Sequence, residues 1–276
     1  MNKFLKLSIS LSSLLVCSVF AAQPKDVPSC YDVLQLGEYK PATAERHFIV
    51  IIDQTARLDE VLKKSVHQQI EQFVSAGDQV QIVAFSANAK GKYTDLVYNG
   101  RFDSPLSADI RNSIGKMTLN KFDACFKAQS KAKSKLHNEL HGAFGDGVSE
   151  FPKTELIGSL LQVSTDILGS VGDGRKVVLI VSDMLENSSI TSFYAKNAVR
   201  QIDATSELAK VNKAGLSGDF AGADVYVIGA GFVGKGMAYS SQQALRSLES
   251  FWRELVKQHN GNLKQFGKPQ LLSPMQ

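Results

Sequence analysis

Two aspartates each end a run of apolar residues, which places their carboxylates where a folded sheet could use them chemically. Residues 48–52 read Phe-Ile-Val-Ile-Ile and end at Asp53, and residues 177–181 read Val-Val-Leu-Ile-Val and end one serine before Asp183. Continuous branched runs of this length are typical of strands that are buried on both faces of a parallel sheet. Open α/β sheets bind ligands at the carboxyl ends of such strands. We therefore expect Asp53 and Asp183 to belong to a binding site.

Two threonines accompany the aspartates. Thr55 lies two residues after Asp53, and Thr154 lies at the start of the helical segment that leads into the second apolar run. Each residue also has a purely structural explanation, because Thr55 and Thr154 could be helix caps and Asp183 could shape a polar turn. The order of the residues along the chain is more specific than any one of them.

In this order the chain resembles the von Willebrand factor A (vWA) domain over about residues 47–231. The metal-ion-dependent adhesion site of that family uses Asp-x-Ser-x-Ser after the first strand, a distant threonine, and an aspartate after the fourth strand. The resemblance implies that Asp53, Thr55 and Thr154 contact a divalent ion or its waters and that Asp183 helps through water. It also implies that the first and fourth strands are neighbours in the sheet.

The same resemblance implies a ligand chemistry. Carboxylate and hydroxyl oxygens form a hard shell that suits Mg²⁺ or Mn²⁺. In the family, waters and an acidic side chain of a protein partner complete this shell. We therefore expect a protein ligand that binds through a carboxylate.

One position departs from the family pattern, because Arg57 stands where the second serine belongs. A guanidinium beside a divalent cation would repel it. Two interpretations remain open at this point. Either Arg57 points to solvent and a weakened metal site survives, or Arg57 pairs with Asp53 or Asp183 and replaces the metal.

The elements that must position these residues alternate between strand and helix. This pattern predicts one doubly wound α/β domain with a mostly parallel sheet, helices on both faces and a helical insertion. We expect strands at residues 47–52, 79–85, 92–98, 176–182 and 224–228, the third of them at the edge of the sheet. We expect helices at residues 58–74, from Thr154 onward, 196–213 and 242–259.

The amino-terminal residues predict export. Lys3 and Lys6 precede an apolar run over residues 7–20 that closes on Ala21 and Ala22, as in a secretory signal peptide. An uncleaved anchor and a lipoprotein modified at Cys17 are the alternatives. We expect a periplasmic or secreted protein with no membrane span after signal cleavage.

The expected organisation is a signal peptide at 1–21, an amino-terminal extension at 22–45, a vWA-like domain at 46–262 with a helical insertion at about 103–152, and a carboxyl-terminal tail at 263–276. The mature chain keeps two cysteines, Cys30 and Cys125. Two cysteines in an exported protein suggest one disulfide, here between the extension and the insertion, and two separate buried thiols are the alternative.

The charge balance excludes one class of partner. The formal net charge is +4, and it falls to +2 when Lys3 and Lys6 are removed with the signal peptide. A balance so close to neutral gives no support to nucleic acid binding.

Two motifs are weaker than they look. Residues 229–236 read Gly-Ala-Gly-Phe-Val-Gly-Lys-Gly and match nucleotide-binding loops in part. They lack the Ser or Thr for magnesium and a following strand that ends in an acid, so we expect no nucleotide. His137 and His141 are one helical turn apart and could bind zinc, but exposed histidines on a polar helix are the more common case.

The favoured function is therefore an exported, non-enzymatic binding protein. The first alternative is an envelope scaffold whose degenerate site is free of metal, with Arg57 in place of the ion. The second is a metal-dependent hydrolase that uses the same carboxylates. No Gly-x-Ser-x-Gly nucleophile motif is present in the sequence to support a serine hydrolase.

Overall fold

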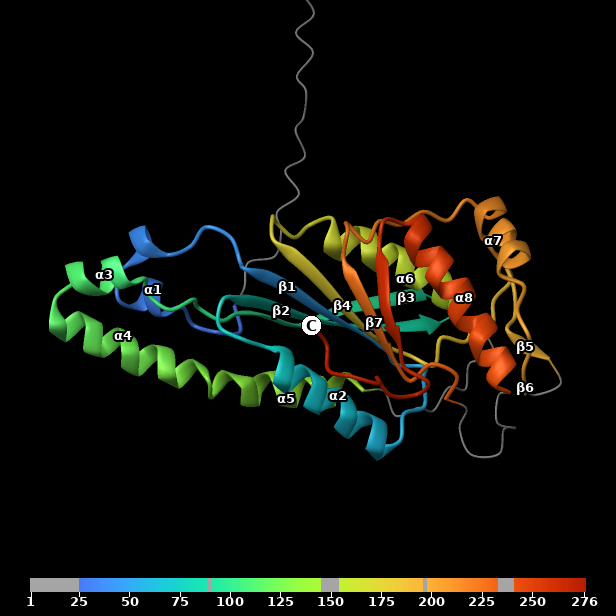
Figure 1. Ribbon diagram of the computed structural model, residues 1–276, viewed down its shortest axis with the longest axis horizontal. Coiled ribbons are helices and arrows are strands. Elements are labelled where there is room, and N and C mark those ends of the chain that lie inside the picture. Colours follow the sequence, from blue (N-terminus) through green and yellow to red (C-terminus); the bar gives the residue numbers. More distant parts are fainter. Residues whose placement is uncertain (1–24, 89–90, 145–153, 196–197, 233–240) are drawn as a thin grey trace, which may run out of the picture.

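A six-stranded sheet forms the centre of the computed structural model, which describes residues 25–88, 91–144, 154–195, 198–232 and 241–276 (Figure 1). The strand order is β3-β2-β1-β4-β7-β8. β1 pairs in parallel with β2 and β4, β4 with β7, and β7 with β8, while β3 pairs with β2 in the antiparallel direction at the edge. The strands are β1 (Arg46–Asp53), β2 (Asp78–Asn88), β3 (Gly91–Arg101), β4 (Arg175–Val181), β7 (Asp224–Ile228) and β8 (Asn262–Phe266). The α/β fold class and the expected contact between the first and fourth strands are confirmed.

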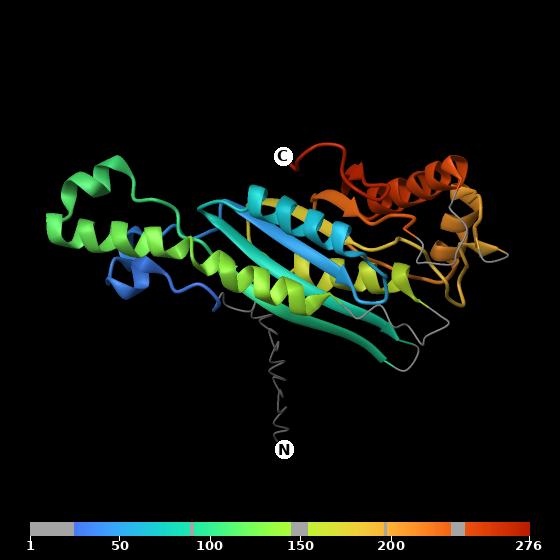
Figure 2. The ribbon, with the colours of Figure 1, turned by 90° about the horizontal axis from the view of Figure 1, so that it is seen from below.

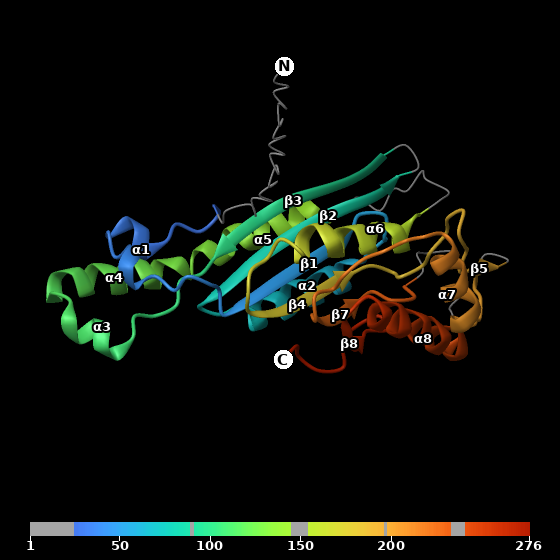
Figure 3. The ribbon, with the colours of Figure 1, turned by 90° about the horizontal axis from the view of Figure 1, so that it is seen from above.

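Helices cover both faces of the sheet, which explains the unbroken apolar runs. α2 (Glu60–Phe73) and α5 (Ala132–Ala143) lie on one face (Figure 2), and α6 (Leu156–Val163) and α8 (Gln242–Gln258) lie on the other (Figure 3). Side chains of residues 48–52 and 177–181 alternate between the two cores, and all of them are fully buried. A strand in this position needs apolar residues on both sides.

An elongated arm extends from the amino ends of the parallel strands (Figure 1). It contains α1 (Cys30–Val33), η1 (Gly37–Tyr39), α3 (Ala108–Ser113) and α4 (Lys116–Gln129). The disulfide between Cys30 and Cys125 joins the extension to α4 inside this arm. Tyr31 and Phe122 pack edge to face beside it, in a small apolar cluster separate from the two cores of the sheet.

The buried side chain of Asp103 links segments of the arm through hydrogen bonds. Its carboxylate, on a residue only 3% exposed, accepts hydrogen bonds from the Cys30 N–H at 2.6 Å, the Ser29 hydroxyl at 3.0 Å and the Gln129 amide at 2.8 Å. A buried carboxylate is tolerated when such donors replace water. The arm is therefore held by a covalent bond and by a satisfied polar group at the same point.

Two segments differ from the sequence-based expectation. The helix expected at 196–213 is shorter, because α7 (Ala204–Lys213) begins after the N-cap Asp203, and a two-stranded hairpin of β5 (Tyr194–Ala195) and β6 (Ala198–Val199) precedes it. The tail expected at 263–276 contains most of β8, which extends the sheet beyond β7. A π-helical turn, η2 (Ser164–Leu168), follows α6.

The expected signal peptide at 1–21 lies outside the described residues, and so do Lys196, the first residue of the expected helix, and residues 233–236 of the glycine-rich motif. Within the described ranges, no helix combines the length and the apolar character that crossing a bilayer requires.

Candidate functional site

Asp53 lies at the carboxyl end of β1 and is almost completely buried, with 1% of its surface exposed. Its Oδ1 atom accepts hydrogen bonds from the Thr55 N–H at 2.9 Å and from the Thr55 hydroxyl at 2.5 Å. Its Oδ2 atom accepts a hydrogen bond from the Ser182 hydroxyl at 2.8 Å. The side chain that caps α2 is Asp59, which accepts from the Leu62 N–H at 2.8 Å. Thr55 is therefore engaged with Asp53 and is not the cap of this helix.

Asp183 lies beside Asp53, because β4 is the parallel neighbour of β1. Burial, together with repulsion from Asp53, raises the pKa of the Asp183 carboxyl to about 8. Burial also raises the pKa of Asp53, although the hydroxyls of Thr55 and Ser182 act against this shift. Two carboxyl groups in one low-dielectric environment resist ionising together. The site therefore has excess acidic character that a cation or a proton can neutralise.

The loop after β4 is held rigidly around Asp183. Met184 adopts a positive φ of 61°, which is uncommon for a residue with a side chain. Its N–H donates to the Ser182 hydroxyl at 3.0 Å, and its carbonyl oxygen accepts from the indole of Trp252 on α8 at 2.9 Å. The N–H of Leu185 donates to Asp183 at 2.9 Å, so this aspartate also shapes the turn. Conformations of this kind persist where the surrounding structure imposes them.

Thr154 joins the same loop through its backbone. It forms an antiparallel bridge with Asn187, with hydrogen bonds of 3.0 Å and 3.1 Å between the two backbones. Within the described structure its hydroxyl makes no hydrogen bond to Asp53 or Asp183. Thr154 precedes α6 by two residues and does not begin this helix.

Glu186 caps α6 in place of Thr154. Its Oε2 atom accepts a hydrogen bond of 2.7 Å from the N–H of Ile157, and the residue is fully buried. Burial raises the pKa of this carboxyl to about 7. Its Oε1 atom has no hydrogen-bond partner among the described residues.

Arg57 is exposed at the rim of the site. In the part of the chain that the structure describes, it forms no ion pair with Asp53 or Asp183. Val61, on the first turn of α2, is also exposed, with 64% of its surface accessible. Arg57 therefore presents a cation to solvent four residues after Asp53.

The β5–β6 hairpin brings Tyr194 near both aspartates. Burial raises the pKa of its phenol, and the negative charges of Asp183 and Asp53 raise it further. Tyr194 as a residue is half-buried, and its phenol lies close enough to the acidic pair for both charges to act on it.

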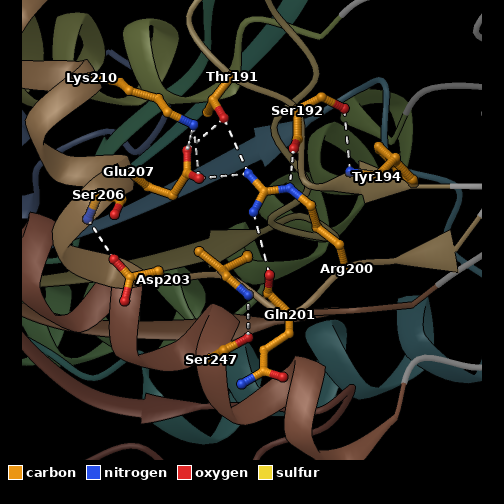
Figure 4. Close-up of polar contacts among 11 residues, drawn as sticks. Thr191, Ser192, Tyr194, Arg200, Gln201, Asp203, Ser206, Glu207, Lys210 and Ser247 are labelled. Carbon is orange, nitrogen blue, oxygen red and sulfur yellow. Dashed lines mark hydrogen bonds and ion pairs between the residues drawn. The ribbon is translucent and has the colours of Figure 1, made fainter.

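A buried ion pair anchors this hairpin to α7 (Figure 4). Arg200 donates to Glu207 at 2.7 Å and to the carbonyl oxygen of Ser192 at 2.7 Å. Glu207 also accepts hydrogen bonds from the Thr191 hydroxyl at 2.6 Å and from Lys210 at 3.0 Å. These contacts hold the pKa of Glu207 below its usual value although burial acts in the opposite direction.

The donor chemistry fits a small divalent cation. The hydroxyls of Thr55 and Ser182 donate hydrogen bonds to Asp53. The Ser182 oxygen also accepts from the Met184 N–H, so one of its lone pairs, together with those of Thr55, remains for an ion beside two carboxylates. Oxygen ligands of this kind suit Mg²⁺ and Mn²⁺. Among the residues described by the structure, no three His, Cys, Asp or Glu side chains form a metal-binding group, so any ion here depends on the hydroxyls and on water.

Sequence reasoning missed three residues of this region. Ser182 carried a readable signal, since it separates the apolar run of β4 from Asp183. Tyr194 and Glu186 carried none, because both are placed by a loop and a hairpin without any periodic pattern.

Comparisons with known proteins show only distant similarity. No protein-family profile and no curated protein matches the chain. An aerotolerance-related membrane protein from Bacteroides fragilis, solved with multiple mutations to serines, has 12% identity and a TM-score of 0.33, covering 80% of this chain and 92% of its own. The conserved hypothetical protein BatB from Bacteroides thetaiotaomicron has 12% identity and a TM-score of 0.38, covering 80% and 90%. Neither similarity indicates what this chain binds.

Proposed function

We propose that this chain is an exported, non-enzymatic binding protein of the vWA type. Its site at the carboxyl edge of β1 and β4 would bind Mg²⁺ or Mn²⁺ and, through the ion, an acidic side chain of a protein partner. The observation that carries the proposal is the pair of neighbouring carboxyl groups, Asp53 and Asp183, with the hydroxyls of Thr55 and Ser182 directed at Asp53. A divalent cation would neutralise the repulsion that this arrangement creates.

The position of Arg57 supports a site that still accepts an ion. Its exposed side chain leaves the two aspartates without a guanidinium partner in the described structure. At the rim, Arg57 could attract the acidic groups of a partner before the partner carboxylate reaches the ion. Thr154 remains the candidate third ligand, and its hydroxyl would have to contact the ion or one of its waters.

Melting measurements test this proposal. Millimolar Mg²⁺ or Mn²⁺ should raise the melting temperature of the mature protein, because an ion that binds only the folded state stabilises it. Asp53→Ala should remove this gain. Asp166→Ala, which changes an exposed carboxylate on η2, should keep it. An unchanged melting temperature of the wild-type protein with either ion would argue against the metal site.

One observation favours a second function, a scaffold whose site is free of metal. Burial and the nearby Asp53 raise the pKa of Asp183 to about 8, which favours its protonated form at neutral pH, and a proton would then take the place of a cation between the two carboxyl groups. A pull-down from envelope extract with the mature protein, with and without chelator, separates the two functions. Partner capture that resists the chelator would favour the scaffold, and capture that the chelator abolishes would favour the adhesion-type site.

A further inference from the structure

Helices α2 and α5 bring together histidines that are far apart in the sequence. The two helices lie side by side on one face of the sheet (Figure 2), and the Nδ1 atoms of His67 and His137 are 2.9 Å apart. The centroids of the two rings are 5.1 Å apart. Each histidine has a second polar residue one turn further along its helix, Glu71 on α2 and His141 on α5.

The two facing nitrogens share one proton in this contact. One Nδ1 atom carries the proton that the other accepts, so the donor ring must move its proton to Nε2 before both Nδ1 atoms can bind an ion. A neutral imidazole is the form that binds metal ions.

Glu71 occupies the place of a supporting carboxylate. The Nε2 atom of His137 lies 3.6 Å from a carboxylate oxygen of Glu71, which is too far for a hydrogen bond, and it has no hydrogen-bond partner among the described residues. The Nδ1 atom of the same ring faces His67. Histidines that bind a metal through one nitrogen usually donate the other N–H to a carboxylate, which fixes the tautomer and the ring orientation. The His137 ring has a candidate partner on each side.

We propose that His67, His137 and His141 bind a transition-metal ion such as Zn²⁺, with Glu71 orienting His137. Two of the nitrogens already face each other, and a tetrahedral ion with Zn–N bonds of about 2.0–2.1 Å needs them to separate to roughly 3.3 Å. The third ligand is not preformed, since no three such side chains surround a common point in the described structure. The exposed ring of His141 reaches the ion by rotating toward His67, and water completes the shell.

This nitrogen site differs in chemistry from the oxygen site at Asp53. Imidazole ligands favour Zn²⁺, Cu²⁺ or Ni²⁺, whereas carboxylate and hydroxyl ligands favour Mg²⁺ or Mn²⁺. The ion would clamp α5 onto α2 in addition to the apolar contacts of Leu136 and Leu140. The proposal is independent of the function proposed above.

Calorimetric titration of Zn²⁺ into the untagged mature protein tests the site. We expect one ion per chain, with an affinity that falls at least tenfold in His67→Ala and in His137→Ala and severalfold in His141→Ala and Glu71→Gln. His259→Ala, a matched histidine that contacts the carbonyl oxygen of Gly218, should leave the affinity unchanged.

Two results would overturn the proposal. The first is an absence of Zn²⁺ binding, or an unchanged affinity in both His67→Ala and His137→Ala. The second is a loss of binding in Asp53→Ala with the histidine variants unaffected, because the ion would then lie at the other site. If a histidine variant fails to fold, diethyl pyrocarbonate modification of the wild type decides the question. Zn²⁺ must protect His67 and His137 but not His259, and equal modification with and without Zn²⁺ contradicts the site.

Discussion

At the scale of single residues, the carboxyl edge of the sheet contains acids that are placed where ionisation is costly. Asp53 is buried and Asp183 beside it is half-buried, and Glu186 lies in the core three residues after Asp183. Burial raises the pKa of each of these carboxyl groups. Natural proteins usually concentrate such groups at functional sites, although structural networks produce them as well.

Glu186 makes the free energy of unfolding depend on pH. Burial raises its pKa from the ordinary 4.5 to about 7, so between these pH values the folded state holds a proton that the unfolded state has lost. The stabilisation from Glu186 is therefore fully present below about pH 4.5 and is lost as the pH rises through about 7, by on the order of 3 kcal/mol.

The variant Glu186→Gln should remove this contribution and keep an acceptor oxygen for the N–H of Ile157. Urea unfolding at a series of pH values should show the wild type losing more stability than the variant between about pH 5 and about pH 8. Parallel stability curves for the two proteins would mean that Glu186 does not titrate as described.

At this scale the sequence predicted the positions of residues that end a strand. It did not predict the contacts of residues that are positioned by loops or by the packing of helices. Asp53 and Asp183 were readable because the apolar runs before them are continuous. The contact between His67 and His137 was not readable, since it joins residues 70 positions apart through the packing of two helices. The contact of Glu186 with the first turn of α6 was not predictable either, because it joins residues 29 positions apart through a loop.

At the scale of elements, the β5–β6 hairpin depends on its link to α7. Glu207 is 3% exposed, and its carboxylate accepts hydrogen bonds from Arg200, Thr191 and Lys210. Removing one partner of a buried ion pair leaves an incompletely compensated charge. The position of Tyr194 beside the acidic pair follows from this anchoring.

The variant Arg200→Ala should destabilise the protein by about 2–3 kcal/mol and loosen the hairpin, because Glu207 loses its closest cation and Ser192 loses a donor. Hydrogen exchange should quicken at the N–H of Phe193, which donates to the carbonyl oxygen of Glu186. The matched variant Lys210→Ala removes a more exposed cation from the same carboxylate and should cost less than about 1 kcal/mol. Equal effects of the two variants would contradict the anchoring role of Arg200.

The elements that the sequence did not predict are those without a repeating pattern of apolar residues. β8 was missed because only Leu263 and Phe266 in this strand are buried, which is too short an alternation to recognise. β5 and β6 have two residues each and carry no periodicity. The long buried strands and α2 were readable because burial on two faces or on one helical stripe leaves a repeating pattern.

At the scale of the whole molecule, the arm and the sheet have separate apolar clusters. The arm and the site lie at opposite ends of the sheet. The arm projects from the amino ends of the parallel strands (Figure 3). Asp53 and Asp183 lie at their carboxyl ends. The disulfide joins Cys30 and Cys125, which are 95 positions apart in the sequence. The loop-entropy account gives such a cross-link about 4–5 kcal/mol of stabilisation.

The double variant Cys30→Ser and Cys125→Ser should therefore loosen the arm first. We expect faster hydrogen exchange in α1 and α4, with β1 and β4 still protected, because the cores of the sheet do not include the arm. The oxidised wild type is the control. Simultaneous loss of protection in the arm and in β1 would show that the molecule unfolds as a single unit.

The most direct test of the proposed function follows the magnetic resonance signal of free Mn²⁺ during titration into the mature protein. The adhesion-type site predicts that one Mn²⁺ binds per chain and that Mg²⁺ displaces it. The same account predicts loss of this binding in Asp53→Ala, weakening in Asp183→Asn, and no change in His137→Ala. A free Mn²⁺ signal equal to the total added to the wild type, or equal binding by wild type and Asp53→Ala, would contradict it.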